Sequence, residues 1–438
     1  MKGDKSRDSS RLDMRKSVEV QVDSDFALLL PSGAYEIKKM EPRRRLRSIV
    51  FICLMLAVAG IIGFGYFCPD QACALSKREA IVQSELGFTN PFRRNFGKPL
   101  QQVALNPGLS YDDVQKDDFQ FDMDAHDVMV FLHIQKTGGT SFGRHLVQDL
   151  DLKRPCECQR KRKRCYCFRT HRNENWLFSR YSTGWKCGLH ADWTELINCV
   201  DEELDKNEGE TAKRRYFYIT LLRDPVVRFL SEFRHVQRGA TWKTARHWCS
   251  GRQATPAELP PCYSGENWTG VSFDEFSKCD SNLAINRQTR MLSDLALVGC
   301  YNQSSMPAHE RDRIMLASAK KNLASMSYFG LTEHQKISQY VFEETFNLRF
   351  AIPFDQHNST VSSSTLSRLS PRQKLIAKQL NSLDDELYSY AKQLLFSRFE
   401  RLKAKDPKFE ERFSHLGLLT GKNGVTEFNW DRNLDETI

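Results

Sequence analysis

Two short apolar runs, each followed by a polar loop and a helical pattern, place the strongest constraint on the fold of this chain. The first run is Val128–Ile134, and the segment after it, Ser141–Leu150, carries apolar residues at helical spacing. The second run, Arg215–Leu222, leads through an Arg-Asp-Pro loop into a predicted helix, Val226–Gln237. Continuous apolar runs of this length are typical of buried parallel strands. Strand, loop and helix recurring in this order predict an α/β fold with a parallel sheet.

A run of twenty uncharged residues, Ile49–Cys68, lies well before these units. It has the length that a helix needs to cross roughly 30 Å of hydrocarbon. Basic residues cluster immediately before it, at Lys38, Lys39, Arg43, Arg44, Arg45 and Arg47. The positive-inside rule therefore leaves the N-terminus in the cytosol. A cleaved signal peptide is the alternative, but the run is too long and starts too far along the chain.

These features predict a type II single-pass signal-anchor at 48–68, with 1–47 as a cytosolic tail. We expect a stem over 69–125, an enzymatic domain over 126–405 and a C-terminal tail over 406–438. Ten of the thirteen cysteines run from Cys156 to Cys300, an even number that suits an oxidising lumen. Glycosylation sequons beyond the membrane begin at Asn267, Asn302 and Asn358. The composition, with 40% hydrophobic residues and a net charge of +9, excludes a disordered chain.

The loop after the first strand has the composition of a phosphate cradle. It reads His133, Ile134, Gln135, Lys136, Thr137, Gly138, Gly139, Thr140 and Ser141. The two glycines let successive N–H groups converge on an anion, and the hydroxyls stand where the helix dipole favours negative charge. The lysine precedes the glycines, whereas a Walker A loop places it after them, so a metal-dependent NTPase is disfavoured. An ordinary Gly-Gly turn is the alternative interpretation.

The exit of the second strand carries a second set of anion-binding candidates. Arg223 follows the strand directly, and Ser231 stands eight residues further on, within the predicted helix. In a parallel sheet, the carboxyl end of a strand faces the crevice where ligands bind. An arginine and a serine there are suited to a phosphate. A buried Arg–Asp pair before a helix cap is the alternative.

At this point the sequence resembles a known family. The strings Phe131–Ser141, Trp176–Trp193 and His235–Lys243 are similar to those of the heparan-sulfate 6-O-sulfotransferases, over roughly residues 125 to 395. The resemblance implies a P-loop-like sulfotransferase fold, with a central parallel sheet flanked by helices. It also implies a Golgi enzyme that moves a sulfuryl group from 3′-phosphoadenylyl sulfate (PAPS) to the 6-hydroxyl of glucosamine in heparan sulfate. PAPS is then a co-substrate, and no metal is required.

The resemblance also implies roles for individual residues. His190 matches the family's catalytic base, and a neutral imidazole can accept a proton from a hydroxyl near neutral pH. Lys136 is expected to stabilise charge on the leaving phosphate. Further nucleotide contacts are implied at Asp355, Gln356, His357, Val361 and Ser362, although family members carry a basic residue where this chain has Val361. The expected saccharide groove comprises Lys163, Arg164, Arg180, Trp185, His190, His235 and Trp242.

A basic segment fits the acceptor side. Between Lys153 and Arg172 there are nine Lys or Arg residues and one acid, Glu157. Nucleic acid is absent from the lumen, so a sulfated glycan is the natural polyanion there. Two C-x-C motifs interrupt the segment, and they could hold zinc or form disulfides that brace a basic hairpin. Disulfides suit the compartment better, but the sequence leaves their pairing open.

Three rival functions remain. A membrane sulfotransferase of 2-O or 3-O specificity would share the same motifs. A luminal nucleotide-dependent kinase would need ATP and magnesium in place of PAPS. A non-catalytic heparan-binding membrane protein could use the same basic surface, although the presence of Lys136 and His190 favours an enzyme. The sequence does not indicate an oligomeric state.

Overall fold

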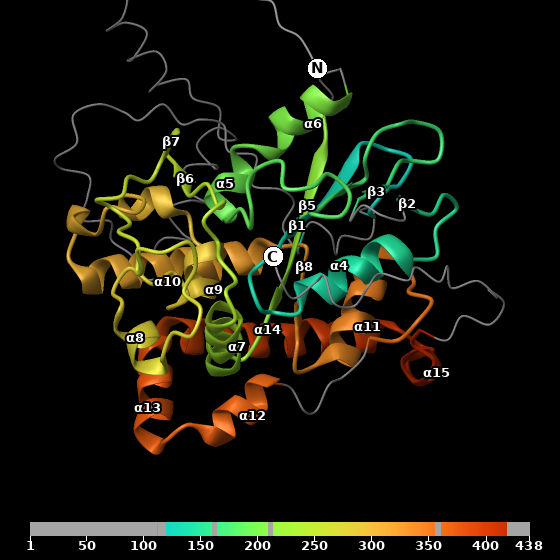
Figure 1. Ribbon diagram of the computed structural model, residues 1–438. Helices are drawn as coiled ribbons and strands as arrows, with labels where there is room; N and C mark the ends of the chain where they lie inside the picture. Colours follow the sequence, from blue (N-terminus) through green and yellow to red (C-terminus); the bar gives the residue numbers. More distant parts are fainter. Residues whose placement is uncertain (1–111, 113–119, 160–163, 209–212, 355–360, 418–438) are drawn as a thin grey trace, which may run out of the picture. The chain divides into compact units, whose positions relative to one another are not determined.

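The computed structural model (Figure 1) describes residues 112, 120–159, 164–208, 213–354 and 361–417. The chain divides into two compact units, 1–100 and 101–438, and all the described residues belong to the second. The predicted cytosolic tail and membrane span lie outside the described residues, as does most of the predicted stem. No helix among the described residues combines the length and the apolar composition that a membrane crossing requires.

A parallel sheet forms the centre of the described unit. Its four strands in the described residues lie in the order β4 (Leu177–Phe178), β1 (Asp127–Leu132), β5 (Arg215–Leu222) and β8 (Tyr328–Leu331). β1 and β5 pair in register from Asp127 with Arg215 to Leu132 with Thr220. The predicted parallel sheet is therefore confirmed, and its two long strands are the two apolar runs seen in the sequence.

Helices lie on both sides of the sheet (Figure 1). This explains why every residue of β1 is buried, because neither face of the strand meets water. In chain order, the α-helices of the described residues are α4 (Gly139–Gln148), α5 (Trp193–Ile197), α6 (Val200–Glu208), α7 (Pro225–Gln237), α8 (Phe273–Lys278), α9 (Arg287–Leu292), α10 (Ala308–Ser325), α11 (Gln335–Phe346), α12 (Val361–Arg368), α13 (Pro371–Leu380), α14 (Ser382–Lys405) and α15 (Phe409–Ser414).

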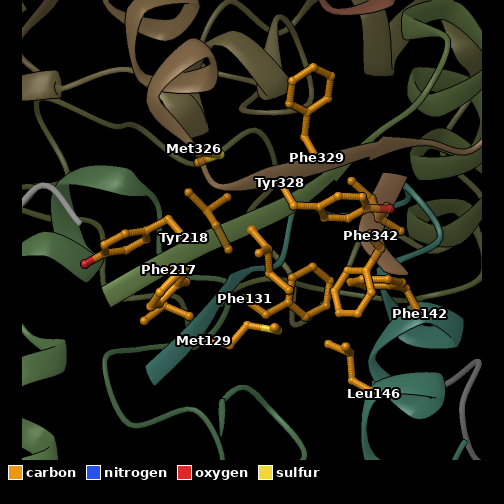
Figure 2. Packing of buried hydrophobic residues seen from close by; sticks show 14 of the residues in the cluster. Met129, Phe131, Phe142, Leu146, Phe217, Tyr218, Met326, Tyr328, Phe329 and Phe342 are labelled. Atoms are coloured by element: carbon orange, nitrogen blue, oxygen red, sulfur yellow. The ribbon is translucent and has the colours of Figure 1, made fainter. Parts of the chain in front are cut away.

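Aromatic side chains join the sheet to the helices. Figure 2 shows the cluster in which Phe131 of β1 meets Phe142 of α4, with ring centroids 5.3 Å apart. Phe142 also lies 5.9 Å from Phe342 of α11 and 5.9 Å from Tyr328 of β8. Each such buried side chain contributes about 3–5 kcal/mol against truncation to alanine. This packing fixes α4, and so the loop before it, against the end of the sheet.

Two short hairpins and a set of disulfides stand outside the main sheet. The hairpins are β2 (Glu157–Cys158) with β3 (Cys165–Tyr166), and β6 (Trp248–Cys249) with β7 (Arg252–Gln253). All ten cysteines from Cys156 to Cys300 are paired, as Cys156–Cys167, Cys158–Cys165, Cys187–Cys199, Cys249–Cys300 and Cys262–Cys279. The two C-x-C motifs therefore brace the β2–β3 hairpin, and the zinc alternative is excluded for them.

Candidate active site

The loops that leave the sheet at its carboxyl edge are tied to one another. Because β1 and β5 are adjacent and parallel, residues 133–138 and Arg223 leave the sheet side by side. The Arg223 guanidinium donates from Nη1 to the carbonyl oxygen of Lys136, at 3.2 Å. Thr332, which follows β8, donates through Oγ1 to the carbonyl oxygens of Thr137 at 2.6 Å and Leu222 at 3.0 Å. The residues that follow β5 and β8 thus fix the backbone of the candidate phosphate loop.

The backbone of this loop turns sharply before α4. Lys136 and Gly138 both adopt left-handed backbone angles, with φ of 65° and 85°. Gly138 is the N-cap of α4 and provides no side-chain cap, and the first turn of the helix contains no acidic residue. A helix start with a glycine cap and no acidic residue in its first turn is suited to an anion.

The loop side chains divide into two groups. Ile134, Gln135, Thr137 and Gly139 are buried, and the Thr137 hydroxyl donates to the carbonyl oxygen of Ile134 at 3.0 Å. Gly139 has no room for a side chain, because a Cβ there would lie 2.3 Å from Cδ2 of His133. Two cradle side chains, Lys136 and Thr140, are half-buried, while Gly138 and Ser141 are exposed. The buried group shapes the loop, and the others can face a ligand.

His190 lies beside this loop with a defined tautomer. Its Nδ1 is 2.9 Å from the carbonyl oxygen of His133. A carbonyl oxygen only accepts hydrogen bonds, so Nδ1 carries the proton and Nε2 keeps its lone pair. Burial lowers the pKa of His190 to about 3, and the positive charge of Arg180 acts in the same direction. The hydrogen bond to the His133 carbonyl raises the pKa and offsets this effect only in part. The imidazole is therefore neutral near pH 7 and offers one basic nitrogen.

Aromatic rings enclose His190. The rings of Trp185 and Trp242 have centroids 4.6 Å and 5.2 Å from the imidazole, and the ring of His133 lies at 4.7 Å. His133 stacks between Phe131 and Trp185, and its Nδ1 has no hydrogen-bond partner among the described residues. Burial, together with the positive charges of Arg180 and Lys136, holds the pKa of His133 well below its usual value.

Most of the predicted acceptor residues gather here. Arg180 donates from Nη1 to the Thr140 hydroxyl at 3.4 Å, and its guanidinium lies 5.3 Å from the Trp185 ring. His235 lies 5.5 Å from Trp242. The pocket at His190 is also lined by His133, Arg180, Trp185, Lys186 and Gly188. The site thus places a base between two indoles and one arginine.

The hairpin residues stand apart from this group. Arg164 is exposed on the β2–β3 hairpin, with its guanidinium 5.7 Å from the Tyr166 ring. The backbone N–H of Cys165 donates to the carbonyl oxygen of Tyr181 at 2.6 Å, which joins the hairpin to the segment that carries Arg180. Lys163 lies outside the described residues.

The second set of anion-binding candidates is partly assembled. Ser231 is half-buried on α7, and Asp224 caps that helix by accepting a hydrogen bond from the N–H of Val227 at 2.9 Å. Nε of Arg223 lies 4.0 Å from the Glu333 carboxylate, and among the ion pairs of the described residues there is none between Arg223 and Asp224. α12 starts at Val361, includes Ser362, and packs against α7. Asp355, Gln356 and His357 lie outside the described residues.

Comparison with known proteins decides the family. Residues 119–391 match the model of the sulfotransferase family. The chain belongs to this family. It is 48% identical to heparan-sulfate 6-O-sulfotransferase 2 of Gallus gallus, over 83% of this chain and 89% of that protein. It is 56% identical to heparan-sulfate 6-O-sulfotransferase 1 of Homo sapiens, over 64% of this chain and 68% of that protein. The resemblance seen in the sequence is confirmed.

Sequence reasoning missed one part of this sulfotransferase. Glu232 of α7 is fully buried between Arg228, one turn before it, and Arg287 of α9. Trp242 donates from Nε1 to Oε1 of the same carboxylate at 3.0 Å. The i, i+4 spacing of Arg228 and Glu232 was the only local signal, and it is also common on exposed helix faces.

Two of the three sequons lie on the surface of the sulfotransferase. Asn267 and Asn302 are exposed, and each accepts a hydrogen bond from the backbone two residues later. Asn358 lies outside the described residues. Their glycosylation stays a prediction. Among the described residues, no group of three or more His, Cys, Asp or Glu side chains is arranged to hold a metal ion.

Proposed function

We propose that this sulfotransferase moves a sulfuryl group from PAPS to the 6-hydroxyl of glucosamine residues in heparan sulfate. The observation that carries the proposal is His190, a neutral imidazole whose tautomer is fixed by the His133 carbonyl beside a phosphate-type loop. The names of the relatives supply the acceptor and the position on the sugar.

The residues at the carboxyl edge of the sheet fit the phosphates of the donor. The N–H groups after Gly138, the hydroxyls of Thr140 and Ser141, and the ammonium group of Lys136 would hold the 5′-phosphosulfate. Arg223 and Ser231 would hold the 3′-phosphate, with Asp355, Gln356, His357, Val361 and Ser362 completing the nucleotide contacts. The donor supplies the sulfuryl group and an ionised phosphate as leaving group. Because cations already hold that phosphate, the chemistry needs no metal.

His190 is the proposed general base. Its Nε2 takes the proton from the attacking hydroxyl, and the hydrogen bond from Nδ1 to the His133 carbonyl stabilises the imidazolium that forms. Lys136 stabilises negative charge that develops on the leaving oxygen. An in-line displacement requires the two to act on opposite sides of the transferred group.

The acceptor is proposed to lie against Trp185 and Trp242. Indole faces pack on sugar rings, and the cations near them pair with sulfates and carboxylates of the chain. Arg180 and His235 flank these rings, and Arg164 extends the basic surface along the β2–β3 hairpin. Lys163, which lies outside the described residues, is the remaining proposed contact to the saccharide.

The proposed location is the Golgi membrane. The chain would be anchored by 48–68, with 1–47 in the cytosol and 69–125 as a luminal stem before the domain at 126–405. The five disulfides among the described residues support an oxidising compartment. Asn267, Asn302 and Asn358 would carry glycans there.

One assay tests the activity. The purified full chain is incubated with labelled PAPS and desulfated heparin, and the labelled product is cut into disaccharides. Label at the 6-position is expected, and it should disappear in Lys136→Ala while thermal unfolding stays unchanged. Label at the 2- or 3-position would assign another regiospecificity. If the chain binds heparin but neither binds PAPS nor transfers sulfate, it is a heparan-binding protein and the proposal fails.

A further inference from the structure

A buried carboxylate beneath the acceptor site has all of its hydrogen-bonding positions filled. In the part of the chain that the structure describes, four donors reach Glu232. Its Oε2 accepts from Nη1 of Arg228 at 2.5 Å and from Nε of Arg287 at 2.8 Å. Its Oε1 accepts from Nη2 of Arg287 and from Nε1 of Trp242, the latter at 3.0 Å. A carboxylate offers about four such positions, so none is left over.

The fourth of these donors differs from the other three. Arg228 and Arg287 are buried cations that need a counterion wherever they lie. Trp242 is uncharged and half-buried, and it stands on the loop after α7, at the rim of the site. Its indole N–H is the only polar group of the ring. The hydrogen bond to Glu232 therefore fixes the orientation of the indole, which forms a T-shaped contact with the His190 ring at an interplanar angle of 83°.

The two neighbouring arginines keep the Glu232 carboxylate ionised. Burial alone would raise the pKa of Glu232, but Arg287 and Arg228 outweigh that effect and hold its pKa at about 2. The carboxylate is therefore ionised at neutral and at mildly acidic pH. A charge-assisted hydrogen bond to a rigid, ionised acceptor is stronger than one to a neutral group.

We propose that Glu232 is a positioning residue that holds the indole of Trp242 against His190. The inference rests on the proposed function, which places the acceptor sugar against Trp185 and Trp242, next to His190. Glu232 touches neither donor nor acceptor. Its hydrogen bond holds Trp242, and its negative charge also acts on His190, where it raises the pKa of the imidazole. Replacing Glu232 should therefore change the position of the acceptor relative to His190, and it should leave donor binding unchanged.

The hydrogen bond can be removed without changing the shape of the ring. Trp242 is replaced by 3-(3-benzothienyl)alanine, in which sulfur takes the place of the indole N–H. In the full chain, kcat/KM for the acceptor is expected to fall roughly ten- to a hundredfold through misplacement of the sugar, with KM for PAPS unchanged. A value within about twofold of the wild type would overturn the proposal.

Trp176 offers a matched control. It is fully buried, and its indole N–H has no hydrogen-bond partner among the described residues. The same replacement at Trp176 should leave acceptor kinetics unchanged. A loss at Trp176 equal to that at Trp242 would show that the analogue itself harms the protein, and the positioning role would fall.

A double-mutant cycle that combines Glu232→Gln with the benzothienyl analogue at Trp242 distinguishes a positioning role from general support of the fold. If Glu232 acts through Trp242, the effect of Glu232→Gln on acceptor kcat/KM should largely vanish when the indole N–H is already absent. If Glu232 only supports the fold, the two effects should multiply, which contradicts the proposal. Should Glu232→Gln fail to fold, the analogue at Trp242 still decides the matter.

A spectroscopic measurement keeps this inference distinct from the proposed function. The chain is labelled with 5-fluorotryptophan, and the ¹⁹F resonance of Trp242 is assigned by its loss in Trp242→Phe. Glu232→Gln should shift and broaden that resonance. Glu208→Gln, which alters a buried carboxylate paired with Arg214 before β5, should not. An unmoved Trp242 resonance overturns the proposal even if sulfate transfer is intact, whereas absent transfer in the wild type overturns only the function.

Discussion

At the scale of single residues, the site depends on an imidazole that stays neutral. The folded chain holds the pKa of His190 at about 3, whereas its ordinary value is 6.5. Between these two values the unfolded chain binds a proton that the folded chain does not. The stability linked to His190 is therefore fully present above pH 6.5 and is lost as the pH falls toward 3.

His190→Ala tests both the chemistry and this linkage. Sulfate transfer should fall by roughly 10²–10⁴-fold, the usual contribution of a general base. The free energy of unfolding, measured by urea titration at several pH values, should depend less on pH between 3 and 6.5 than in the wild type. PAPS affinity measured by calorimetry serves as the control and should not change. Near-normal transfer would remove His190 from the role of base.

Residues of this kind differ in how far the sequence reveals them. Lys136 and His190 stand in long strings that resemble a family, so their positions could be predicted without a structure. Glu232 could not be predicted, because Arg287 lies 55 residues away in sequence and the pairing depends on how α7 meets α9. A buried ion pair leaves no local pattern unless both partners share a helix.

At the scale of elements, the turn between β1 and α4 joins the donor loop to the base. A Cβ at Gly139 would lie 2.3 Å and 2.6 Å from ring atoms of His133, whose carbonyl orients His190. Gly139→Ala should therefore destabilise the chain by about 1–3 kcal/mol and weaken PAPS binding. Thermal unfolding and calorimetry measure the two effects. Gly265→Ala is the control, because the nearest atom to a Cβ there is 3.5 Å away. Equal effects at both sites would contradict this account.

The boundaries of these elements show what an apolar pattern can and cannot predict. The predicted strand Val128–Ile134 ends at Leu132, because His133 and Ile134 are buried within the loop rather than in the sheet. The predicted helix Ser141–Leu150 begins at Gly139, after the left-handed Gly138. Hydrophobicity reports burial, and burial alone does not separate a strand from the loop that continues it. The short edge strands β4 and β8 were not predicted, since they are defined by pairing with β1 and β5.

At the scale of the whole molecule, the proposed donor site and the proposed acceptor site lie in different regions of the described residues. The carboxyl edge of the parallel sheet carries the donor loop, and this edge followed from the order of strands and helices. The proposed acceptor side comes from the stretch between Cys156 and Cys300, whose loops and short hairpins are held by five disulfides. Their number could be predicted from an even cysteine count, but their pairing depends on contacts that only the folded chain defines.

One of these disulfides should matter for chemistry as well as for stability. His190 lies in the sequence between Cys187 and Cys199, which are 12 residues apart, whereas Cys262 and Cys279, 17 residues apart, close a loop that does not contain His190. Loops of such similar length predict a loss of about 3 kcal/mol from either pair when both cysteines are replaced by alanine. Sulfate transfer at a temperature where both variants are folded should fall only for Cys187→Ala/Cys199→Ala, because that loop orients the base. Equal activity in the two variants, with equal thermal unfolding, would mean that His190 is held by the His133 carbonyl and its ring neighbours alone.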